Sequence, residues 1–133
     1  MLEKLEKIVI NAHAPYSKFH VAALLVMEDG TEIPGVNVEN ASYGATICAE
    51  RNAILHAVAL GYKKGDFKKI YVYVPQEKSS TPCFVCRQVI TEFFEKEKEV
   101  ICVNKSGEET IYKVSELCPH PFDESDLVWK VDL

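Results

Sequence analysis

The sequence predicts an α/β fold, a three-layer α/β/α sandwich around a mixed five-stranded sheet. Two kinds of pattern alternate along its 133 residues, because segments with apolar residues at helical spacing are separated by short apolar runs of strand length. The predicted order is helix, hairpin, helix, strand, helix, strand and strand. Strands that are joined through helices favour a mostly parallel central part of the sheet, and the opening hairpin adds antiparallel strands.

The first predicted helix has one apolar face and one charged face, and Pro15 ends it. The apolar face contains Leu2, Leu5, Ile8, Val9 and Ala12. The next segment, residues 19–27, is mostly apolar and of strand length. Asp29-Gly30 is a strong hairpin signal, so a return strand is predicted from residue 31 to about residue 40.

The second predicted helix covers residues 48–60 and ends at Gly61. It is apolar nearly all round, which is typical of a helix in the interior of a sandwich. A third helix is predicted from residue 82 or 83 to about residue 96. The remaining strands are predicted at residues 70–74, 100–103 and 110–114, and a turn joins the last two.

Length and composition limit the classes of protein. With 47% hydrophobic residues, the chain fits a single domain over residues 1–133 with a modest core. The 15 basic and 20 acidic residues give a net charge of −5, which disfavours a nucleic-acid binder. The sequence contains no apolar stretch of membrane-helix length and no secretory signal. We therefore expect a cytoplasmic protein with no membrane partner, in which cysteines are metal ligands or catalytic groups rather than disulfide partners.

Three of the five cysteines lie where a loop becomes a predicted helix. Cys83 and Cys86 are one helical turn apart on a shared face, so their sulfurs can bind one ion. The N-terminus of a helix favours a thiolate over a thiol. If the two helices begin at the same edge of the sheet, Cys48 completes a set of three thiolates.

Three thiolates leave one tetrahedral position of zinc open, which is the catalytic arrangement, whereas a structural site uses four ligands. A fourth ligand could come from Cys102, Cys118 or a histidine, although a buried inert thiol is the commoner role for Cys102. Glu50 lies two residues after Cys48, roughly 200° away around a helix, and still reaches the same pocket if that pocket faces down the helix axis. There it would be the general acid and base of a hydrolytic removal of an amine.

Arg51 directly follows this glutamate. Three thiolates on one zinc ion leave a net negative charge, and we predict that Arg51 offsets it through hydrogen bonds to the thiolates. Two other interpretations of the cysteines are a redox pair at Cys83 and Cys86 and a cysteine–histidine nucleophile. Neither explains the Cys48-Ala49-Glu50 segment, and none of the four histidines lies in a recognisable partner motif.

The motifs together resemble the cytidine deaminase family, in its small homotetrameric zinc-dependent type that acts on free nucleosides. The shared segments are Pro15-Tyr16-Ser17-Lys18-Phe19, Asn37-Val38-Glu39-Asn40-Ala41, Cys48-Ala49-Glu50-Arg51, Pro82-Cys83-Phe84-Val85-Cys86-Arg87-Gln88 and Leu117-Cys118-Pro119-His120-Pro121-Phe122. The resemblance covers nearly the whole chain and implies a homotetramer whose active sites are shared between subunits.

The resemblance also implies a role for each site residue. One Zn²⁺ per subunit would be bound by Cys48, Cys83 and Cys86, with Glu50 as proton shuttle and Arg51 as partner of the thiolates. The substrate-binding set would be Phe19, Asn37, Val38, Glu39, Tyr43, Ala49 and Phe122. In that set the backbone N–H of Ala49 binds the pyrimidine O2. Asn37 and Glu39, which face the same way on a strand, hydrogen-bond the ribose 3′-hydroxyl.

The aromatic members of this set would act partly across subunits. Phe19 would pack around the base together with Phe122 from a neighbouring subunit, and Tyr43 would contribute to a neighbour's sugar site. Taken only as residues, the two phenylalanines are more typical of a core. Tyr43 is more typical of a turn, and Asn37 and Glu39 are more typical of a solvated strand edge.

Three segments depart from the family pattern. Phe84 follows the second cysteine ligand, where the family has glycine, and its large side chain could reduce the base pocket or pack into a subunit interface. Ala22 replaces a second family glycine and adds bulk near Phe19. Residues 128–133 do not belong to the shared pattern.

The predicted function is hydrolytic deamination of cytidine and deoxycytidine to uridine and deoxyuridine, with release of ammonia, in pyrimidine salvage. An alternative keeps the chemistry but acts on a modified cytosine nucleoside or a nucleoside antibiotic such as blasticidin S. Nucleic-acid editing is disfavoured, because those deaminases usually present His where this chain has Cys48. A non-catalytic zinc-stabilised module would have no need of Glu50.

Overall fold

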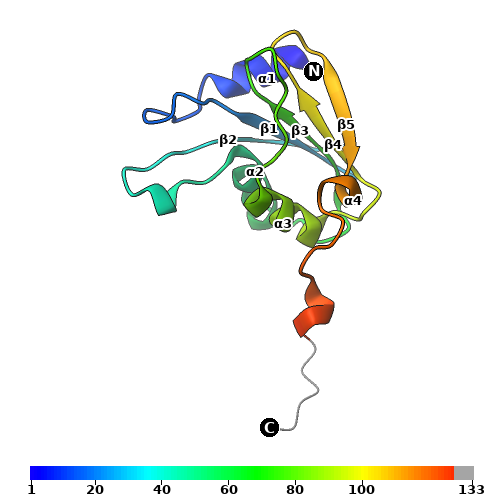
Figure 1. Cartoon of the computed structure of the whole chain (residues 1–133). Coiled ribbons are helices and arrows are strands. Elements are labelled where there is room, and N and C mark those ends of the chain that lie inside the picture. The colour runs from blue at the N-terminus through cyan, green and yellow to red at the C-terminus, as the bar shows by residue number, and fades with distance from the viewer. Residues whose placement is uncertain (128–133) are drawn as a thin grey trace.

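The computed structural model describes residues 1–127 and contains one five-stranded sheet (Figure 1). Its strands are β1 (Ala22–Met27), β2 (Glu32–Val36), β3 (Phe67–Tyr73), β4 (Glu99–Val103) and β5 (Glu109–Lys113). They lie in the order β2-β1-β3-β4-β5. The predicted mixed five-stranded sheet is therefore confirmed.

Helices cover both faces of the sheet, which confirms the three-layer sandwich (Figure 1). The helices are α1 (Leu2–Val9), α2 (Ala49–Ala59), α3 (Phe84–Phe93) and α4 (Val114–Leu117), with 3₁₀ turns η1 (Tyr43–Ala45) and η2 (Glu124–Leu127). On one face Leu5 of α1 packs with Tyr71 and Tyr73 of β3. On the other face, α2, α3 and α4 pack on the side chains of the sheet that point away from α1.

The expected mostly parallel centre is wrong, because only β3 and β4 run parallel and the other three neighbouring pairs are antiparallel. The chain enters β1, returns in β2 and then passes through α2 to β3 on the far side of β1. Since β3 has the same direction as β2, it pairs antiparallel with β1. The crossover through α3 then produces the parallel pair of β3 and β4.

Several predicted elements are shorter than expected. The first helix ends at Val9, and the strand predicted from residue 19 begins only at Ala22. Its partner ends at Val36, because the residues that follow form isolated bridges with the segments near His13 and Ile47. The third strand spans Phe67–Tyr73 rather than 70–74, and α3 ends at Phe93 rather than near residue 96.

Helix α2 is only half buried, which corrects the expectation of an interior helix. Ala53 and Ala57 pack on the sheet, but Leu55 and Val58 on the outer side are exposed. On its inner side α2 lies directly against β2 at Gly35. A Cβ atom on this glycine would lie 2.5 Å from the carbonyl oxygen of Ala49 and 2.6 Å from the nitrogen of Ala53. Glycine at this position therefore lets the helix approach the strand.

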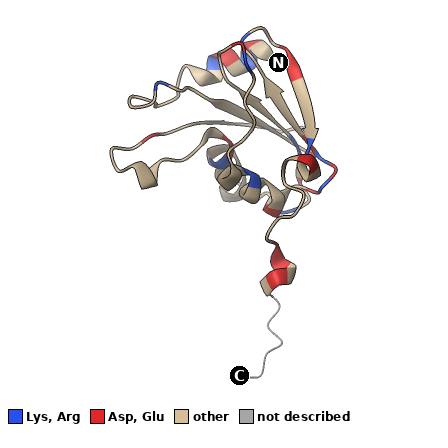
Figure 2. Cartoon of the chain, in the orientation of Figure 1, with Lys and Arg blue, Asp and Glu red and all other residues tan. Residues whose placement is uncertain are grey.

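Charged residues of both signs are spread over the surface, and Glu124 and Asp126 make the short η2 turn acidic (Figure 2). Within residues 1–127, no helix is long and apolar enough to cross a membrane. The departure from the family pattern at residues 128–133 lies outside the described residues.

Candidate active site

Three cysteines from two helix starts come together as predicted. Cys48 directly precedes α2, Cys83 directly precedes α3, and Cys86 lies in the first turn of α3. Their Sγ atoms all lie within 4.8 Å of one another, and those of Cys48 and Cys83 are 3.7 Å apart. Two thiolates on one tetrahedral zinc ion, each with a Zn–S bond of about 2.3 Å, would lie about 3.8 Å apart. The donor type and the spacing therefore fit zinc.

The cysteine set has three members within residues 1–127, because neither Cys102, Cys118 nor a histidine joins it. Cys102 is buried in β4, and burial raises the pKa of its thiol to about 11. This outcome matches the prediction of an inert buried thiol. Cys118 is half-buried at the end of α4. Three ligands are the number that leaves zinc an open position.

Cys48 is the sulfur most disposed to ionise. A hydrogen bond from the Cys86 thiol lowers the pKa of Cys48 to about 5, against the opposing effect of burial, and Arg51 adds to the shift. Because Cys86 donates this hydrogen bond to Cys48, the pKa of its thiol is raised, and burial and the Glu50 carboxylate raise it further. A thiolate at the start of a helix is the form that binds a metal ion.

Arg51 lies beside the cysteines as the sequence predicted. Its Nη2 atom is 3.6 Å from the Sγ atom of Cys48 and donates a hydrogen bond to it. The Nε–H group of Arg51 is buried and has no hydrogen-bond partner among the described residues. An unpaired buried donor of this kind is unusual in a folded protein.

Glu50 is nearly inaccessible, with an exposed fraction of 4%. Burial raises the pKa of Glu50 to about 7, and the neighbouring Cys48 charge acts in the same direction. Cys48 directly precedes α2 and Glu50 lies in its first turn, and both line the same cleft. The cleft therefore lies at the N-terminal end of α2, in the position that the sequence predicts for a pocket shared by Cys48 and Glu50.

The cleft has a volume of about 420 Å³. Its lining brings together residues from five parts of the chain: Phe19, Val21, Asn37, Glu39, Thr46, Cys48, Glu50, Val72, Val74, Ser80, Thr81 and Cys83. Six of these are predicted site residues. Neither lysine nor arginine is among these lining residues, so the only formal charges at the cleft are carboxylates and thiolates.

Other predicted residues do not line this cleft. Val38 is partly exposed, and Ala49 is buried at the first position of α2. Tyr43 is exposed and lines a neighbouring cavity, where its ring centroid lies 6.0 Å from that of Tyr16. Phe122 belongs to the segment after α4 and is 58% exposed. Tyr43 and Phe122 are the two residues that the resemblance assigned to a neighbouring subunit.

Asn37 binds the backbone that carries Phe19. Its Nδ2 donates to the Phe19 carbonyl oxygen at 2.7 Å, and its Oδ1 accepts from the Val21 N–H at 2.9 Å. The side chain is 8% exposed, and both ends of its amide are used. Asn37 therefore shapes the wall of the cleft, a role that the strand pattern alone does not indicate.

Glu39 accepts hydrogen bonds from the loop before β1. Its Oε1 accepts from the N–H groups of Tyr16 and Ser17, at 3.0 and 3.1 Å, and its Oε2 accepts from the Ser17 hydroxyl. The hydroxyl of Ser17 is the main cause that lowers the pKa of Glu39. The carboxylate is thus held ionised at the rim of the cleft.

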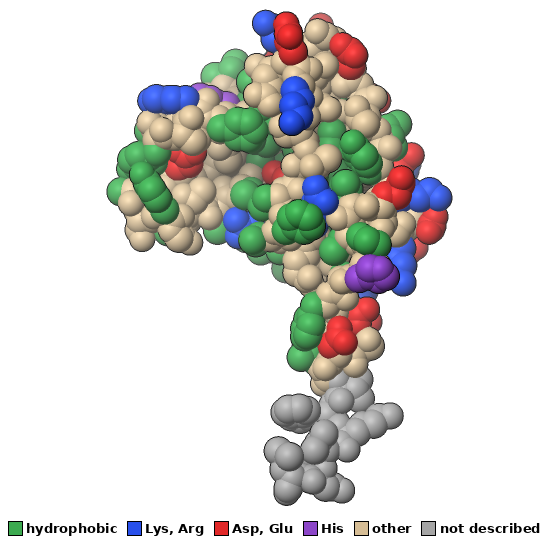
Figure 3. Space-filling view, in the orientation of Figure 1, with side chains coloured by type: hydrophobic (Ala, Val, Ile, Leu, Met, Phe, Trp, Pro, Cys, Tyr) green, Lys and Arg blue, Asp and Glu red, His purple; other side chains and the backbone are tan. Residues whose placement is uncertain are grey.

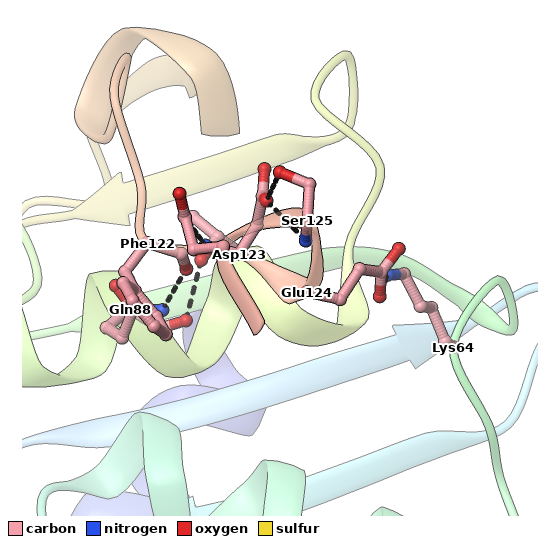
Figure 4. A network of polar contacts seen from close by, with 8 residues as sticks. Lys64, Gln88, Phe122, Asp123, Glu124 and Ser125 are labelled. Atoms are coloured by element: carbon pink, nitrogen blue, oxygen red, sulfur yellow. Dashed lines mark hydrogen bonds and ion pairs between the residues drawn. The ribbon is translucent and has the colours of Figure 1, made fainter. Parts of the chain in front are cut away.

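Two α3 residues that the sequence did not single out tie the site to the C-terminal segment. Arg87 donates to the carbonyl oxygens of Pro82 and Leu117, at 2.7 and 3.0 Å, and to the Thr81 hydroxyl at 2.8 Å. Gln88 donates to the carbonyl oxygen of Phe122 at 2.7 Å (Figure 4). Their only signal in the sequence is their position directly after Cys86.

The two departures within the described residues leave the cleft unchanged. Phe84 is 75% exposed and does not line the cleft, and the Arg87 guanidinium lies 4.4 Å from the centre of its ring. Of the two alternatives for Phe84, a reduced base pocket does not occur within this chain, and packing into a subunit interface stays a prediction. Ala22 packs on the α1 side of the sheet, whereas Ala23 faces α2, so the extra methyl group also lies away from the site.

Comparison with known proteins agrees with this geometry. Residues 1–104 match the family model described as the cytidine and deoxycytidylate deaminase zinc-binding region. A cytidine deaminase of Sporosarcina psychrophila is 40% identical over 121 residues, which cover 91% of this chain and 88% of that protein. One of Halalkalibacterium halodurans is 41% identical over 116 residues, 87% of this chain and 86% of that protein.

Solved structures show the same likeness. The crystal structure of cytidine deaminase from Burkholderia pseudomallei superposes with a TM-score of 0.86 at 40% identity and covers 91% of this chain and 95% of that chain. That from Mycobacterium leprae gives a TM-score of 0.76 at 32% identity, over 90% of this chain and 95% of that chain. The similarity thus extends over nine-tenths of this chain.

Proposed function

The chain belongs to the cytidine and deoxycytidylate deaminase family, and we propose that it hydrolyses cytidine and deoxycytidine to uridine and deoxyuridine with release of ammonia. The observation that carries the proposal is the convergence of three cysteine sulfurs and the buried Glu50 at one cleft. Phe19, Asn37 and Glu39 line that same cleft.

Cys48, Cys83 and Cys86 would hold one zinc ion per subunit. Zinc, when bound, supplies Lewis acidity that makes water a nucleophile at neutral pH. Glu50 takes a proton from the attacking water and delivers protons to the ring nitrogen and to the leaving amino group. The bond from C4 to the amino nitrogen breaks, the water oxygen becomes the carbonyl oxygen, and ammonia leaves. A pKa of about 7 for Glu50 suits a group that both accepts and donates.

The substrate would be held by groups from both sides of the cleft. Phe19 packs against the base, the Ala49 N–H binds the pyrimidine O2, and Asn37 and Glu39 bind the ribose 3′-hydroxyl, next to Val38. Asn37 retains one free N–H after its bond to Phe19, and Glu39 retains an acceptor after its bonds to the loop. Polar groups of this kind suit a sugar and give no support to an antibiotic as substrate.

The cleft suits an uncharged nucleoside better than a nucleotide. The family model includes deaminases of deoxycytidylate, which carries a phosphate. Phosphate sites in proteins present arginine, lysine or a run of backbone N–H groups. The lining residues of this cleft include Glu39 and Glu50 and neither lysine nor arginine. A phosphate would therefore enter an environment of its own sign.

We further propose a homotetramer with shared active sites. Apolar side chains are exposed on the outer side of α2, at the start of α3 and on the segment after α4: Leu55, Val58, Phe84, Val85, Phe122 and Leu127. Figure 3 shows hydrophobic side chains over this part of the surface. Contiguous exposed apolar area is typical of a surface that binds another subunit. The chain is interpreted as one domain, which the sheet with strands from residues 22 to 113 supports. A cytoplasmic role in pyrimidine salvage completes the proposal.

Loss of cytosine absorbance and release of ammonia from cytidine, with purified zinc-loaded protein, test this function. Turnover of cytidine and deoxycytidine is expected. Parallel reactions with blasticidin S and a short single-stranded oligonucleotide should show none. Unchanged cytidine at full zinc occupancy would refute the proposal, and turnover of blasticidin S alone would favour the alternative substrate.

A further inference from the structure

We propose that Ser17 is a positioning residue for substrate binding, because its hydroxyl fixes both the Glu39 carboxylate and the Phe19 backbone at the cleft. The inference rests on the proposed function, since it concerns how this cleft holds a nucleoside. Ser17 itself does not line the cleft, whereas Glu39 and Phe19 do. Ser17 therefore acts on the substrate through these two residues.

The Ser17 hydroxyl makes two hydrogen bonds of opposite sense. It donates to Oε2 of Glu39 and accepts from the N–H of Phe19 at 3.0 Å. A hydroxyl has one hydrogen to donate and two lone pairs to accept with, so both bonds form at once. One small group thus connects the carboxylate proposed to bind the sugar with the aromatic residue proposed to bind the base.

The backbone between these two residues needs to be held. Lys18 has a φ of +61°, in the left-handed region that a residue with a side chain rarely adopts. The hydroxyl bond from Ser17 to Phe19 closes the loop across Lys18. On the other side, Asn37 binds the carbonyl oxygen of Phe19. Phe19 is therefore fixed at its N–H by Ser17 and at its carbonyl by Asn37.

The carboxylate of Glu39 is oriented by the same loop. Its two oxygens accept three hydrogen bonds, from the N–H groups of Tyr16 and Ser17 and from the Ser17 hydroxyl. A carboxylate has about four acceptor positions, so about one stays free for a substrate hydroxyl. Without the hydroxyl bond, only Oε1 of Glu39 is held by the loop, and the orientation of the carboxylate toward the sugar is less fixed.

Removal of the hydroxyl should therefore weaken sugar recognition more than the chemical step. We expect Ser17→Ala to raise the KM for cytidine about tenfold, the scale of one lost hydrogen bond to a charged group, with a much smaller change in kcat. Ser17→Thr keeps the hydroxyl at an exposed position and should restore the KM to within about threefold of the wild type. Ser17→Cys, whose thiol makes weaker hydrogen bonds than a hydroxyl, should have a KM for cytidine between those of Ser17→Ala and Ser17→Thr.

A comparison of cytidine with 3′-deoxycytidine separates a positioning role from a merely structural one. If Ser17 acts through Glu39, the wild type should have a higher kcat/KM for cytidine than for 3′-deoxycytidine, and Ser17→Ala should lose most of this difference. The reason is that in Ser17→Ala the hydrogen bond between Glu39 and the 3′-hydroxyl of cytidine is already weak. Ser106→Ala is the matched control, since Ser106 bonds through its backbone N–H and its side chain is exposed in the turn between β4 and β5. Ser106→Ala should leave kcat/KM for both cytidine and 3′-deoxycytidine unchanged.

Zinc content and melting temperature are measured on every variant, so that a loss of folding is recognised. An unchanged KM in Ser17→Ala would overturn the inference while leaving the proposed function intact. Equal losses for both substrates that Ser17→Thr does not rescue would also overturn it, since they indicate a general distortion of the loop. No turnover of cytidine by the wild type would contradict the proposed function and this inference together.

Discussion

The Nη2 atom of Arg51 lies 3.6 Å from the Sγ atom of Cys48 and donates a hydrogen bond to it. The cation thus touches the sulfur whose pKa is lowered to about 5. Three thiolates around a divalent ion leave an excess negative charge that weakens its Lewis acidity, and a guanidinium at this distance withdraws charge from one ligand. The bond would therefore connect Arg51, the residue directly after Glu50, to the reactivity of a zinc ion held by the cysteines.

Replacement of Arg51 tests this relationship. Arg51→Gln keeps a polar side chain but removes the charge, so kcat should fall by about tenfold while zinc stays bound. Steady-state kinetics and zinc analysis by atomic absorption measure the two effects separately. Unchanged kinetics would mean that the guanidinium serves only to pack the start of α2.

Glu50 is expected to be essential for turnover and dispensable for the metal. Glu50→Gln keeps the shape of a side chain that is 4% exposed but cannot accept a proton. We expect kcat to fall by at least roughly 1,000-fold, near the upper range for a lost general acid and base, with full zinc content. Glu3→Gln on α1 is the matched control and should behave as the wild type. Normal turnover by Glu50→Gln would refute the mechanism.

The charge of the cleft predicts discrimination against nucleotides. Deoxycytidine should be a substrate, whereas kcat/KM for deoxycytidine 5′-monophosphate should be at least roughly 100-fold lower, because a doubly charged phosphate finds no cation among the lining residues. Both are measured by loss of cytosine absorbance under the same conditions. Comparable values for the two compounds would show that a cation outside the lining residues binds the phosphate.

Mixed oligomers test the proposed sharing of active sites. Phe122→Ala and Glu50→Gln should each be nearly inactive alone. Co-assembled, they should regain activity, because a Phe122→Ala subunit can use Phe122 of its Glu50→Gln neighbour. Phe19 and Glu50 line the cleft of the same chain, so a mixture of Phe19→Ala with Glu50→Gln is the matched control and should gain nothing. A gain in neither mixture would argue that Phe122 acts within its own subunit or not at all.

Acid should destabilise the protein partly through Glu39. Hydrogen bonds from Ser17 lower the pKa of this carboxyl from its ordinary value of 4.5, so the unfolded chain binds the proton more readily than the folded one. The stabilisation is present above that ordinary value and is lost as the pH falls through the folded pKa. In thermal unfolding from about pH 6 to about pH 3, Glu39→Gln should therefore lose less stability than the wild type. Glu3→Gln should follow the wild type, and parallel curves for all three would contradict the assignment.

The sequence could predict the sandwich because each element carries its own periodicity. It could not predict the direction of β3. The helical pattern of α2 indicates that a helix connects β2 to β3, but it does not indicate that the connection passes over β1 and so places β3 antiparallel to β1. The predicted start of β1 is too early for a related reason. Phe19 and Val21 are apolar like strand residues, but their backbone is bound by the side chain of Asn37, and a pattern of side chains does not report where backbone hydrogen bonds go.

The metal ligands and Glu50 could be located from spacing, because helical geometry fixes how Cys83 and Cys86 lie relative to each other. Ser17, Arg87 and Gln88 could not, since each makes a hydrogen bond to a partner that lies more than 20 residues away in the sequence. Serine in a loop and arginine on a helix are common without any such role. Only the packed structure shows which partner each one finds.

The missing side chain of Gly35 has a consequence for redesign of this protein. Because β2 and α2 meet with no space for a Cβ atom, any side chain at residue 35 would clash with the start of α2, the part of the helix that carries Cys48 and Glu50. A shift of this helix to make room for larger nucleosides would therefore displace Cys48 and Glu50 together. The side chains of Val72, Val74 and Thr81 also line the cleft and can be shortened one at a time without any change at the contact between β2 and α2.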